Sequence, residues 1–343
     1  MKVDVAIIGA GLAGASTAFH LSQSFRGSIL ILERESAPAL HASGRNAGLV
    51  LQSVADPEIR KLAAAGARAY SRQAEEIGFR KTGSLLLGPR SLLELVLEPE
   101  RVGIEWAEPE EVRGEIPLLA GHSFEAALRT PGDGVMDVRR LMDFYLASAQ
   151  ANGAEIAYRQ EVQSIAAGRF FRIQTPSGTI QASRIVNAAG AWAPRIGVMC
   201  GAQSVALHSF KRHLFVLEAN GRIGPDWPFV WNVEKSFYFR PEDGDVLFSL
   251  CDEEPAAGEL LPTVDPELRN ALAELIFREL PALGSAVQKR AWSCFRTRDP
   301  QEKPLLNWDD AVEGFLWVAG LGGHGVATSW EVGRRAAALI LAV

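Results

Sequence analysis

The sequence predicts an α/β fold in which a parallel sheet covered by helices carries a second, mainly antiparallel α+β domain. The first 33 residues read as strand, glycine turn, helix and strand, the order of a βαβ unit. The middle of the chain instead holds short strand-like segments between Gly, Pro and Asp turns. With 343 residues and 48% hydrophobic composition, the chain is large enough to favour two domains.

The βαβ unit is visible in three consecutive segments. Residues 3–8 are apolar and rich in β-branched side chains, and residues 15–21 are helix formers. Residues 28–33 (SILILE) form a continuous apolar run of strand length, as expected for a parallel strand covered on both faces. The glycine turn lies between the first strand and the helix.

That turn has the spacing of a dinucleotide site. Gly9, Gly11 and Gly14 form G-x-G-x-x-G, and Glu33 ends the next strand. The first glycine permits the tight turn, the second lets a pyrophosphate approach the backbone, and the third lets helix and sheet pack closely. The helix N-terminus presents unpaired N–H groups to phosphates, and Glu33 is placed to accept hydrogen bonds from ribose hydroxyls. A Rossmann-type unit is therefore predicted.

Other elements follow from caps and turns. Asp56 is an N-cap followed by proline and an acid, so a helix is expected from there to Gly78. A second helix is predicted over 138–151, before an Asn-Gly pair. Short strands are expected at 83–88, 122–130, 212–218, 236–240 and 245–251.

Strand signals return at 154–187 and at 315–319, the latter before a glycine turn and a final helix. We therefore expect a discontinuous layout. The dinucleotide-binding domain is assigned to 1–80, 138–205 and 298–343, and the substrate domain to 81–137 and 206–297.

Composition excludes several classes. A net charge of −6 and a pI near 5.7 argue against a nucleic-acid partner, which would need clustered Lys and Arg. The three cysteines (Cys200, Cys251 and Cys294) are far apart, which predicts neither a disulfide framework nor a metal site and fits a reducing cytoplasm. Asp4 interrupts the apolar start, so no signal peptide is expected. No apolar run reaches the ~18 to 20 residues of a membrane span.

Several sequence blocks carry a family resemblance. They are GAGLAGAS, LERESAPALHASGRNAG, NAAGAWA, SFYFRPEDG and GFLWVAGLGGHG, and together they cover nearly the whole chain. These blocks resemble the D-amino acid oxidase family of FAD-dependent oxidoreductases, and within it D-arginine dehydrogenase-like and other D-amino acid dehydrogenase proteins. The resemblance implies an FAD cofactor and a small amine or amino acid substrate.

The resemblance also implies the residues that contact FAD. They are Gly9, Gly11, Leu12, Ala13 and Gly14 in the first turn; Glu33 and Arg34 at the adenosine; Ser43, Arg45, Asn46 and Ala47 along the pyrophosphate and flavin; Val162 at the adenine; Ala188, Gly190 and Trp192 near the phosphates; and Gly322, Gly323, His324, Gly325 and Val326 at the pyrimidine edge of the flavin. The cysteine to which some members attach flavin falls nearest Arg298, and Cys294 lies four residues before that position, so FAD is expected to be non-covalent.

Arg296 is the predicted clamp for a substrate carboxylate. It matches the arginine of the family's R-P-x-T-P-D segment, and its planar fork suits a bidentate carboxylate. The segment departs from the family pattern at Thr297, Gln301 and Asn307.

Four further residues complete the predicted reacting site. Tyr238 matches a tyrosine that lies over the substrate, the alternative being a core tyrosine between phenylalanines. Arg212 is a second candidate substrate contact. His41 and His324 are candidate proton acceptors for the substrate amine, and each is alternatively a structural hydrogen-bonding residue.

The implied function is FAD-dependent oxidation of a D-amino acid by hydride transfer from the α carbon to flavin N5, giving an imino acid. A glycine or sarcosine-type N-substituted amino acid, a 2-hydroxy acid, and flavin binding without turnover stay open as alternatives. The electron acceptor is oxygen, a quinone or a carrier protein, and the lack of an obvious flavin-facing lysine favours a dehydrogenase. The basic stretch at 79–83 (FRKTG) predicts that basic D-amino acids are poor substrates.

Overall fold

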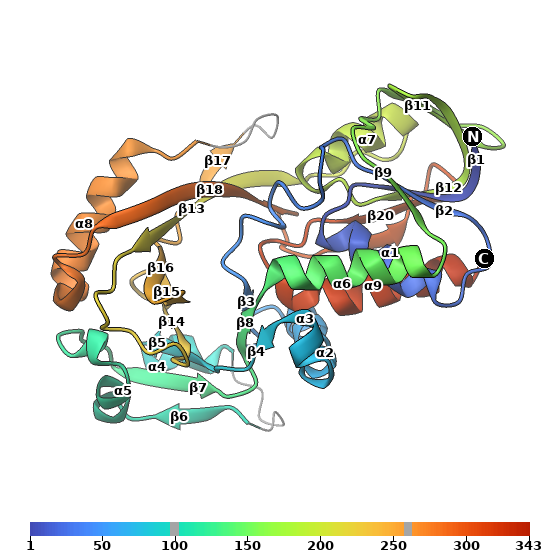
Figure 1. Ribbon diagram of the computed structural model, residues 1–343. Coiled ribbons are helices and arrows are strands. Elements are labelled where there is room, and N and C mark those ends of the chain that lie inside the picture. The colour runs from blue at the N-terminus through green and yellow to red at the C-terminus, as the bar shows by residue number, and fades with distance from the viewer. Residues whose placement is uncertain (97–102, 257–262) are drawn as a thin grey trace.

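Two large sheets dominate the computed structural model, which describes residues 1–96, 103–256 and 263–343. They lie toward opposite ends of the view in Figure 1, with most of the long helices packed beside the right-hand sheet. Parallel and antiparallel pairings both occur, so the predicted α/β class is confirmed. No helix in the described ranges combines the length and apolarity needed to cross a bilayer.

The first sheet contains the predicted βαβ unit. β1 (Lys2–Ile8) is parallel to β2 (Ile29–Leu32) on one side and to β12 (Gly178–Asn187) on the other, and α1 (Leu12–Ser22) connects β1 to β2. The other strands of this sheet are β9 (Glu155–Ala157), β10 (Ser164–Ala166), β11 (Phe171–Thr175), β19 (Leu305–Trp308) and β20 (Phe315–Ala319).

The continuous apolar run of β1 is explained by burial on both faces. Val5 and Ile7 pack into a core with the helices, whereas Ala6 and Ile8 pack into a second core with residues of β11, β12 and α7 (Ala193–Cys200). Successive side chains of a strand point to opposite faces, so both sets must be apolar.

The second sheet is mostly antiparallel, as predicted for the middle of the chain. Its longest pairing joins β13 (His208–Leu217) to β18 (Gln288–Arg298). The other strands are β5 (Ser84–Gly88), β6 (Glu105–Ala107), β7 (Ala126–Thr130), β14 (Phe229–Asn232), β15 (Phe237–Glu242), β16 (Asp245–Ser249) and β17 (Glu254–Ala256). A small sheet of β3 (Leu49–Val50), β8 (Gly134–Met136) and β4 (Phe79–Arg80) lies between.

The two capped helices are found, with one correction. α6 (Val138–Ala151) has the predicted bounds, and the Asp56 side chain accepts from the Ile59 N–H at the start of α2 (Pro57–Arg72). The predicted single helix to Gly78 is wrong. Gln73 leaves the helical region (φ −129°, ψ 25°), and the turn redirects the chain into α3 (Ala74–Ile77), which packs on α6.

Of the remaining helices, α4 (Arg90–Glu94) and α5 (Pro109–Glu115) are short, whereas α8 (Pro266–Glu279) and α9 (Gly325–Leu341) are long. Short 3-10 helices lie at Pro117–Leu119, Gly190–Trp192 and Pro281–Leu283. We propose that the two large sheets mark the two domains, because all strands of each sheet fall within the segments assigned to one domain, apart from the last residue of β18.

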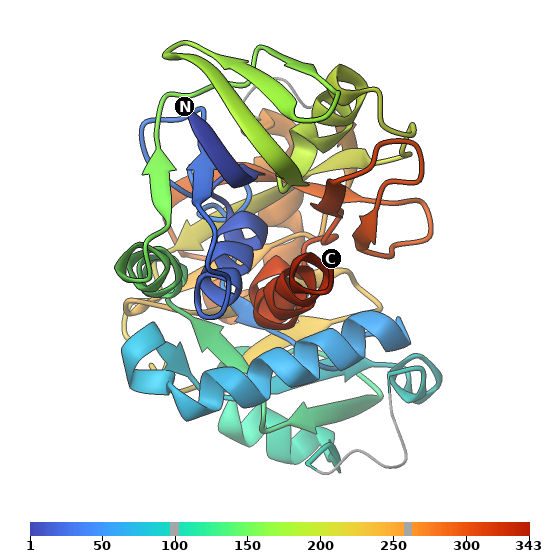
Figure 2. The same cartoon turned by 90° about the vertical axis from the view of Figure 1, so that its right-hand side faces the viewer.

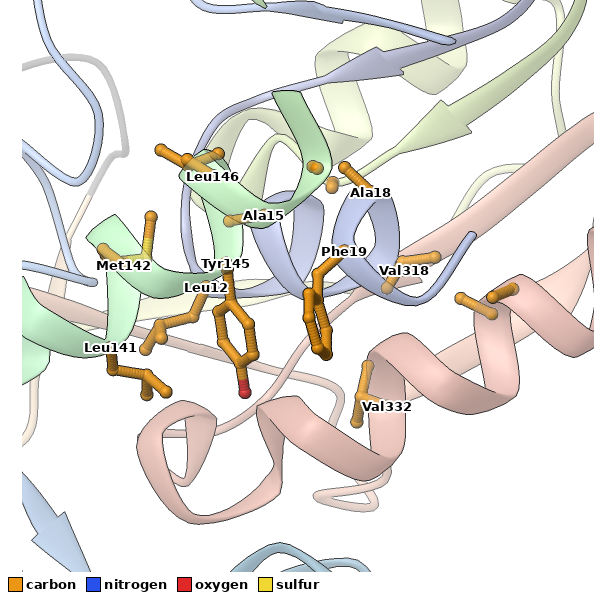
Figure 3. Close-up of a cluster of buried hydrophobic side chains, with 14 of the residues drawn as sticks. Leu12, Ala15, Ala18, Phe19, Leu141, Met142, Tyr145, Leu146, Val318 and Val332 are labelled. Carbon is orange, nitrogen blue, oxygen red and sulfur yellow. The ribbon is translucent and has the colours of Figure 1, made fainter. Parts of the chain in front are cut away.

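Glycines bring three helices into close contact. α6, α1 and α9 lie in a row beside the first sheet, and α2 crosses below α9 (Figure 2). The apolar side chains of α1 fill the space between α6 and α9 (Figure 3). A Cβ at Gly333 would lie 2.5 Å from the carbonyl carbon of Ser16, and a Cβ at Gly66 would collide with the Ala327 carbonyl oxygen. Backbone therefore meets backbone at both crossings.

We expect Gly333→Ala to destabilise the protein by about 1–3 kcal/mol, because the methyl group must push α9 away from α1. The measurement is thermal or urea unfolding of the flavin-free and flavin-bound protein. Gly114→Ala in α5 is the matched control, since no atom lies within 4 Å of its added Cβ. That exposed helical substitution should be neutral or stabilise by up to about 1 kcal/mol. Equal stability of the two variants would contradict the packing argument.

Candidate active site

An elongated cavity runs from the carboxyl ends of β1, β2, β12 and β20 to one face of the second sheet. The carboxyl edge of a parallel sheet is where α/β proteins bind ligands. The cavity is lined by the predicted residues Gly9, Gly11, Leu12, Ala13, Glu33, Arg34, His41, Ser43, Asn46, Ala47, Val162, Ala188, Gly190, Trp192, Arg212, Tyr238, Arg296, Gly322, Gly323, His324, Gly325 and Val326. Gly14 and Arg45 are not among the lining residues.

Close contacts within the protein require glycine at all three positions of the glycine turn. Gly9 has φ +103°, and a Cβ there would lie 2.6 Å from the Ala188 carbonyl oxygen. A Cβ at Gly11 would lie 2.9 Å from Ser43 Oγ, and one at Gly14 would collide with the Gly9 carbonyl oxygen. Gly14 therefore acts in packing α1 against the turn, outside the cavity.

Glu33 is a buried carboxylate held by backbone donors. Its Oε2 accepts from the Ala10 N–H at 2.8 Å and its Oε1 from the Glu35 N–H at 2.9 Å. An ionised carboxylate offers about four lone-pair positions, so two are left for a ligand. The side chain is thus fixed at the end of β2, beside the glycine turn.

A polar cluster next to Glu33 contains one of the predicted bases. The Arg34 guanidinium lies 3.9 Å over the Trp192 ring, and the His41 ring lies 4.6 Å from that ring, centroid to centroid. His41 Nε2 lies 2.9 Å from Glu35 Oε1, a hydrogen bond that, with Arg34, holds the pKa of Glu35 below its usual value. Among the described residues, buried His41 Nδ1 has no hydrogen-bond partner. The contacts of His41 are therefore with the Arg34–Trp192 end of the cavity.

The segment between His41 and β3 is shaped by its own side chains. The Leu12 N–H donates to Ser43 Oγ at 2.9 Å, so Ser43 lies at the N-terminus of α1. Asn46 Nδ2 donates to the Ser43 carbonyl and its Oδ1 accepts from the Gly48 N–H. Arg45 is turned away from the cavity, because its Nε donates to the Ser293 carbonyl oxygen of β18 at 2.9 Å. Arg45 is outside the cavity lining, and its contact with the cofactor stays a prediction.

The segment before α9 brings a second helix N-terminus to the cavity. Gly322 and Gly323 have φ +57° and +85°, and the Gly322 N–H donates to the Thr297 carbonyl of β18. Leu12 Cδ1 lies 3.7 Å from a Cβ built at Gly325, so the N-termini of α1 and α9 lie close together. Burial, followed by the charge of Arg296, lowers the pKa of His324 to about 3. His324 is therefore neutral at pH 7 and holds a captured proton poorly.

The face of the second sheet supplies the other wall of the cavity. Strand alternation places Phe237 and Phe239 in the core behind the sheet, whereas Tyr238 lines the cavity and packs at 5.3 Å from the Trp231 ring. The structure thus separates Tyr238 from its neighbouring phenylalanines. Burial raises the pKa of Tyr238 to about 12, so its phenol is a neutral donor.

Two arginines of adjacent strands converge on one carboxylate oxygen. Arg212 of β13 and Arg296 of β18 each donate to Glu253 Oε1 at 2.9 Å. Arg212 also donates to the Asp252 carbonyl, and Arg296 to the Gly322 carbonyl oxygen at 2.9 Å. Burial, followed by the charge of Arg212, lowers the pKa of Arg296. The predicted clamp therefore touches the loop before α9.

Sequence reasoning missed several residues at this wall. Leu214, Trp231 and Cys294 line the cavity, and alternation from Arg212 and Arg296 along their strands would have found the first and third. Glu253 has no such signal, because it lies in the irregular connection between β16 and β17. His213, beside Arg212 in β13, is fully buried on the opposite face of the strand, with Nδ1 2.6 Å from Asp252 Oδ2. The described ranges contain no group of three or more His, Cys, Asp or Glu side chains that could hold a metal ion.

Comparisons with known proteins agree on one family. Residues 4–339 match the model of the DAO family, described as FAD dependent oxidoreductase. Dimethylglycine dehydrogenase of mouse mitochondria is 25% identical over 365 residues, which cover 97% of this chain and 42% of that protein. The chain thus spans less than half of this relative.

Solved structures share the fold. Glycine oxidase from Geobacillus kaustophilus superposes with a TM-score of 0.86 at 23% identity, covering 99% of this chain and 95% of that one. L-proline dehydrogenase from P. horikoshii gives 0.90 at 21% identity, with 99% and 93% covered.

FAD, the cofactor of this family, fits the residues of the cavity. Two helix N-termini meet there, which suits a pyrophosphate. Gly9 and Gly11 line the cavity in a tight turn that a Cβ would disrupt by colliding with Ala188 or Ser43. The unpartnered His41 Nδ1 and the free lone pairs of Glu33 are polar positions that a nucleotide can satisfy.

We expect acid or heat to release intact FAD from the purified protein. Cys294 lines the cavity, but burial raises the pKa of its thiol to about 11, so it is protonated and a poor nucleophile at neutral pH. The flavin in the supernatant is identified by chromatography. Cys294→Ser should bind as much FAD as the wild type. Flavin that stays with the precipitated peptide would contradict the prediction.

Proposed function

The chain belongs to the DAO family of FAD dependent oxidoreductases, and from this premise we propose that it oxidises the carbon–nitrogen bond of a small amino acid. One observation carries the choice of substrate. Arg212 and Arg296 both line the cavity and both donate to one carboxylate oxygen of Glu253, so this pair of guanidiniums has the geometry to bind a carboxylate group. We assign that role toward the substrate to both arginines.

When bound, FAD accepts the hydride that leaves the substrate carbon. The protein contributes orientation. Arg296 and Arg212 hold the carboxylate, Tyr238 donates a hydrogen bond from its neutral phenol, and Leu214 and Trp231 limit water. Nearby positive charge lowers the pKa of an ammonium group, so the two arginines favour the neutral amine that oxidation requires. This route uses neither His324 nor His41 as a base. We assign His324 to the flavin side as a neutral group.

We propose two candidate types of substrate. D-amino acids follow from the sequence resemblance, whereas N-methylated glycines are supported by the similarity to a dimethylglycine dehydrogenase. The deciding experiment is anaerobic flavin bleaching with glycine, sarcosine, N,N-dimethylglycine, D-alanine and L-alanine. Bleaching by the N-methylated compounds alone selects the second type. If none of these reduces the flavin, the proposal is wrong. Reduction by a 2-hydroxy acid alone would then select hydroxy-acid oxidation, and no reduction at all would select flavin binding without turnover.

We further propose a dehydrogenase that passes electrons to a quinone or carrier protein. No lysine is among the described residues that line the cavity. The family resemblance implies that a lysine beside the flavin is what activates oxygen. Reoxidation of the reduced protein by dissolved oxygen, followed by stopped flow, should be slow compared with reoxidation by an artificial quinone.

Arg296→Leu should leave FAD binding nearly intact while reducing the second-order rate of flavin reduction at least about thirtyfold, since losing a desolvated charged partner costs about 2–5 kcal/mol. Arg296→Lys should recover only part of the loss, because an ammonium cannot reproduce the fork. Arg290→Leu, in the same strand but with a side chain 60% exposed, is the control and should behave as wild type. A rate for Arg296→Leu within about threefold of wild type would move the clamp to Arg212 alone.

Basic amino acids should be poor substrates. The basic stretch that suggested this is not the cause, because neither Arg80 nor Lys81 lines the cavity. Arg212 and Arg296 give the same result, since a cationic side chain would approach two guanidiniums. The check is anaerobic reduction by D-arginine against D-alanine, or by their N-methylated counterparts. Comparable rates for the basic and the neutral member of the pair would show that charge does not select the substrate.

A further inference from the structure

Glu253 is an unusual carboxylate because three arginines surround it. Its Oε1 accepts from Arg212 and Arg296, and its Oε2 accepts from Arg298 at 2.7 Å. Its side chain is 31% exposed, and it is not among the residues that line the cavity. Glu253 therefore lies behind the two cavity arginines and does not fill the substrate position.

Among the residues that the structure describes, the charges at this wall leave one positive charge uncompensated. Arg212 and Arg296 face the cavity, and Glu253 is the carboxylate that the structure places between them. Arg298 also pairs with Glu302 at 2.6 Å. The Asp252 carboxylate is turned to His213, on the other face of β13. The two positive charges of Arg212 and Arg296 are offset by the single negative charge of Glu253. The positive charge that is left over is neutralised by a ligand with a single carboxylate.

We propose that Glu253 is a specificity-determining counter-ion, which restricts the site to amino acids with one carboxylate and excludes dicarboxylic ones. This inference rests on the function proposed above. A dicarboxylic ligand would bring its second carboxylate toward arginines that Glu253 already satisfies, where it meets like charge. Without Glu253, the two guanidiniums have donors and charge for both carboxylates of one ligand.

The test uses flavin-loaded protein and two ligands that need no turnover. Acetate and malonate are titrated separately, and the shift of the visible flavin absorbance gives each dissociation constant. In Glu253→Gln the affinity for malonate relative to acetate should rise at least tenfold over wild type, about 1.4 kcal/mol. Glu253→Asp keeps the charge and should keep the wild-type ratio.

Glu254→Gln is the matched control. It removes the same charge from the next residue, whose partner is Lys211 at 3.1 Å and not a cavity arginine. Its malonate-to-acetate ratio should equal that of wild type. Glu253→Ala provides a second neutral variant if Glu253→Gln fails to retain flavin.

Two results would overturn the inference. A ratio within twofold of wild type in both neutral variants, with neither affinity increased, means that Glu253 only holds the arginines in place. An equal gain for acetate and malonate means that Glu253 competes for the single carboxylate position. Arg296→Leu separates this from the proposed function: if it loses acetate binding while the Glu253 variants leave the ratio unchanged, the clamp stands and the counter-ion role falls.

Discussion

The close packing of α1 on α9 is the contact on which the cavity depends. Gly333 lets α9 meet the backbone of Ser16, and Gly66 lets α2 meet α9 in the same way. Since the helices cannot approach this closely through larger side chains, both N-termini are held beside the ends of β1 and β20. The rest of the site is arranged around this pair of positive helix ends.

The two ends of the cavity carry opposite charges. At one end, the Glu33 carboxylate is fixed by backbone N–H groups, and at the other, Arg212 and Arg296 face the cavity. The helix N-termini lie in the lining with them. Arg212 and Arg296 belong to β13 and β18, and Glu33 directly follows β2, so both charged ends are anchored to the two sheets.

The sequence predicted the parts governed by local rules. The βαβ unit, the caps of α2 and α6 and the strand β20 follow from short-range patterns, and so does the place of the glycine turn. The break at Gln73 and the turn of Arg45 toward Ser293 were missed, because each depends on a neighbour distant in sequence. Glu253 was missed for the same reason. Its partners come from β13 and β18, and no local sequence pattern predicts which strands pair.

α1 and α9, whose N-termini line the cavity, lie very far apart in the sequence. Ribosomal synthesis therefore produces α1 early and α9 late. Contacts between such distant segments form slowly, since a long loop must close before any packing energy is gained. The nascent chain can fold its second sheet while the face of α1 that awaits α9 is still open to water. Because the cavity is complete only when α9 has packed on α1, the cofactor can be held only late in folding.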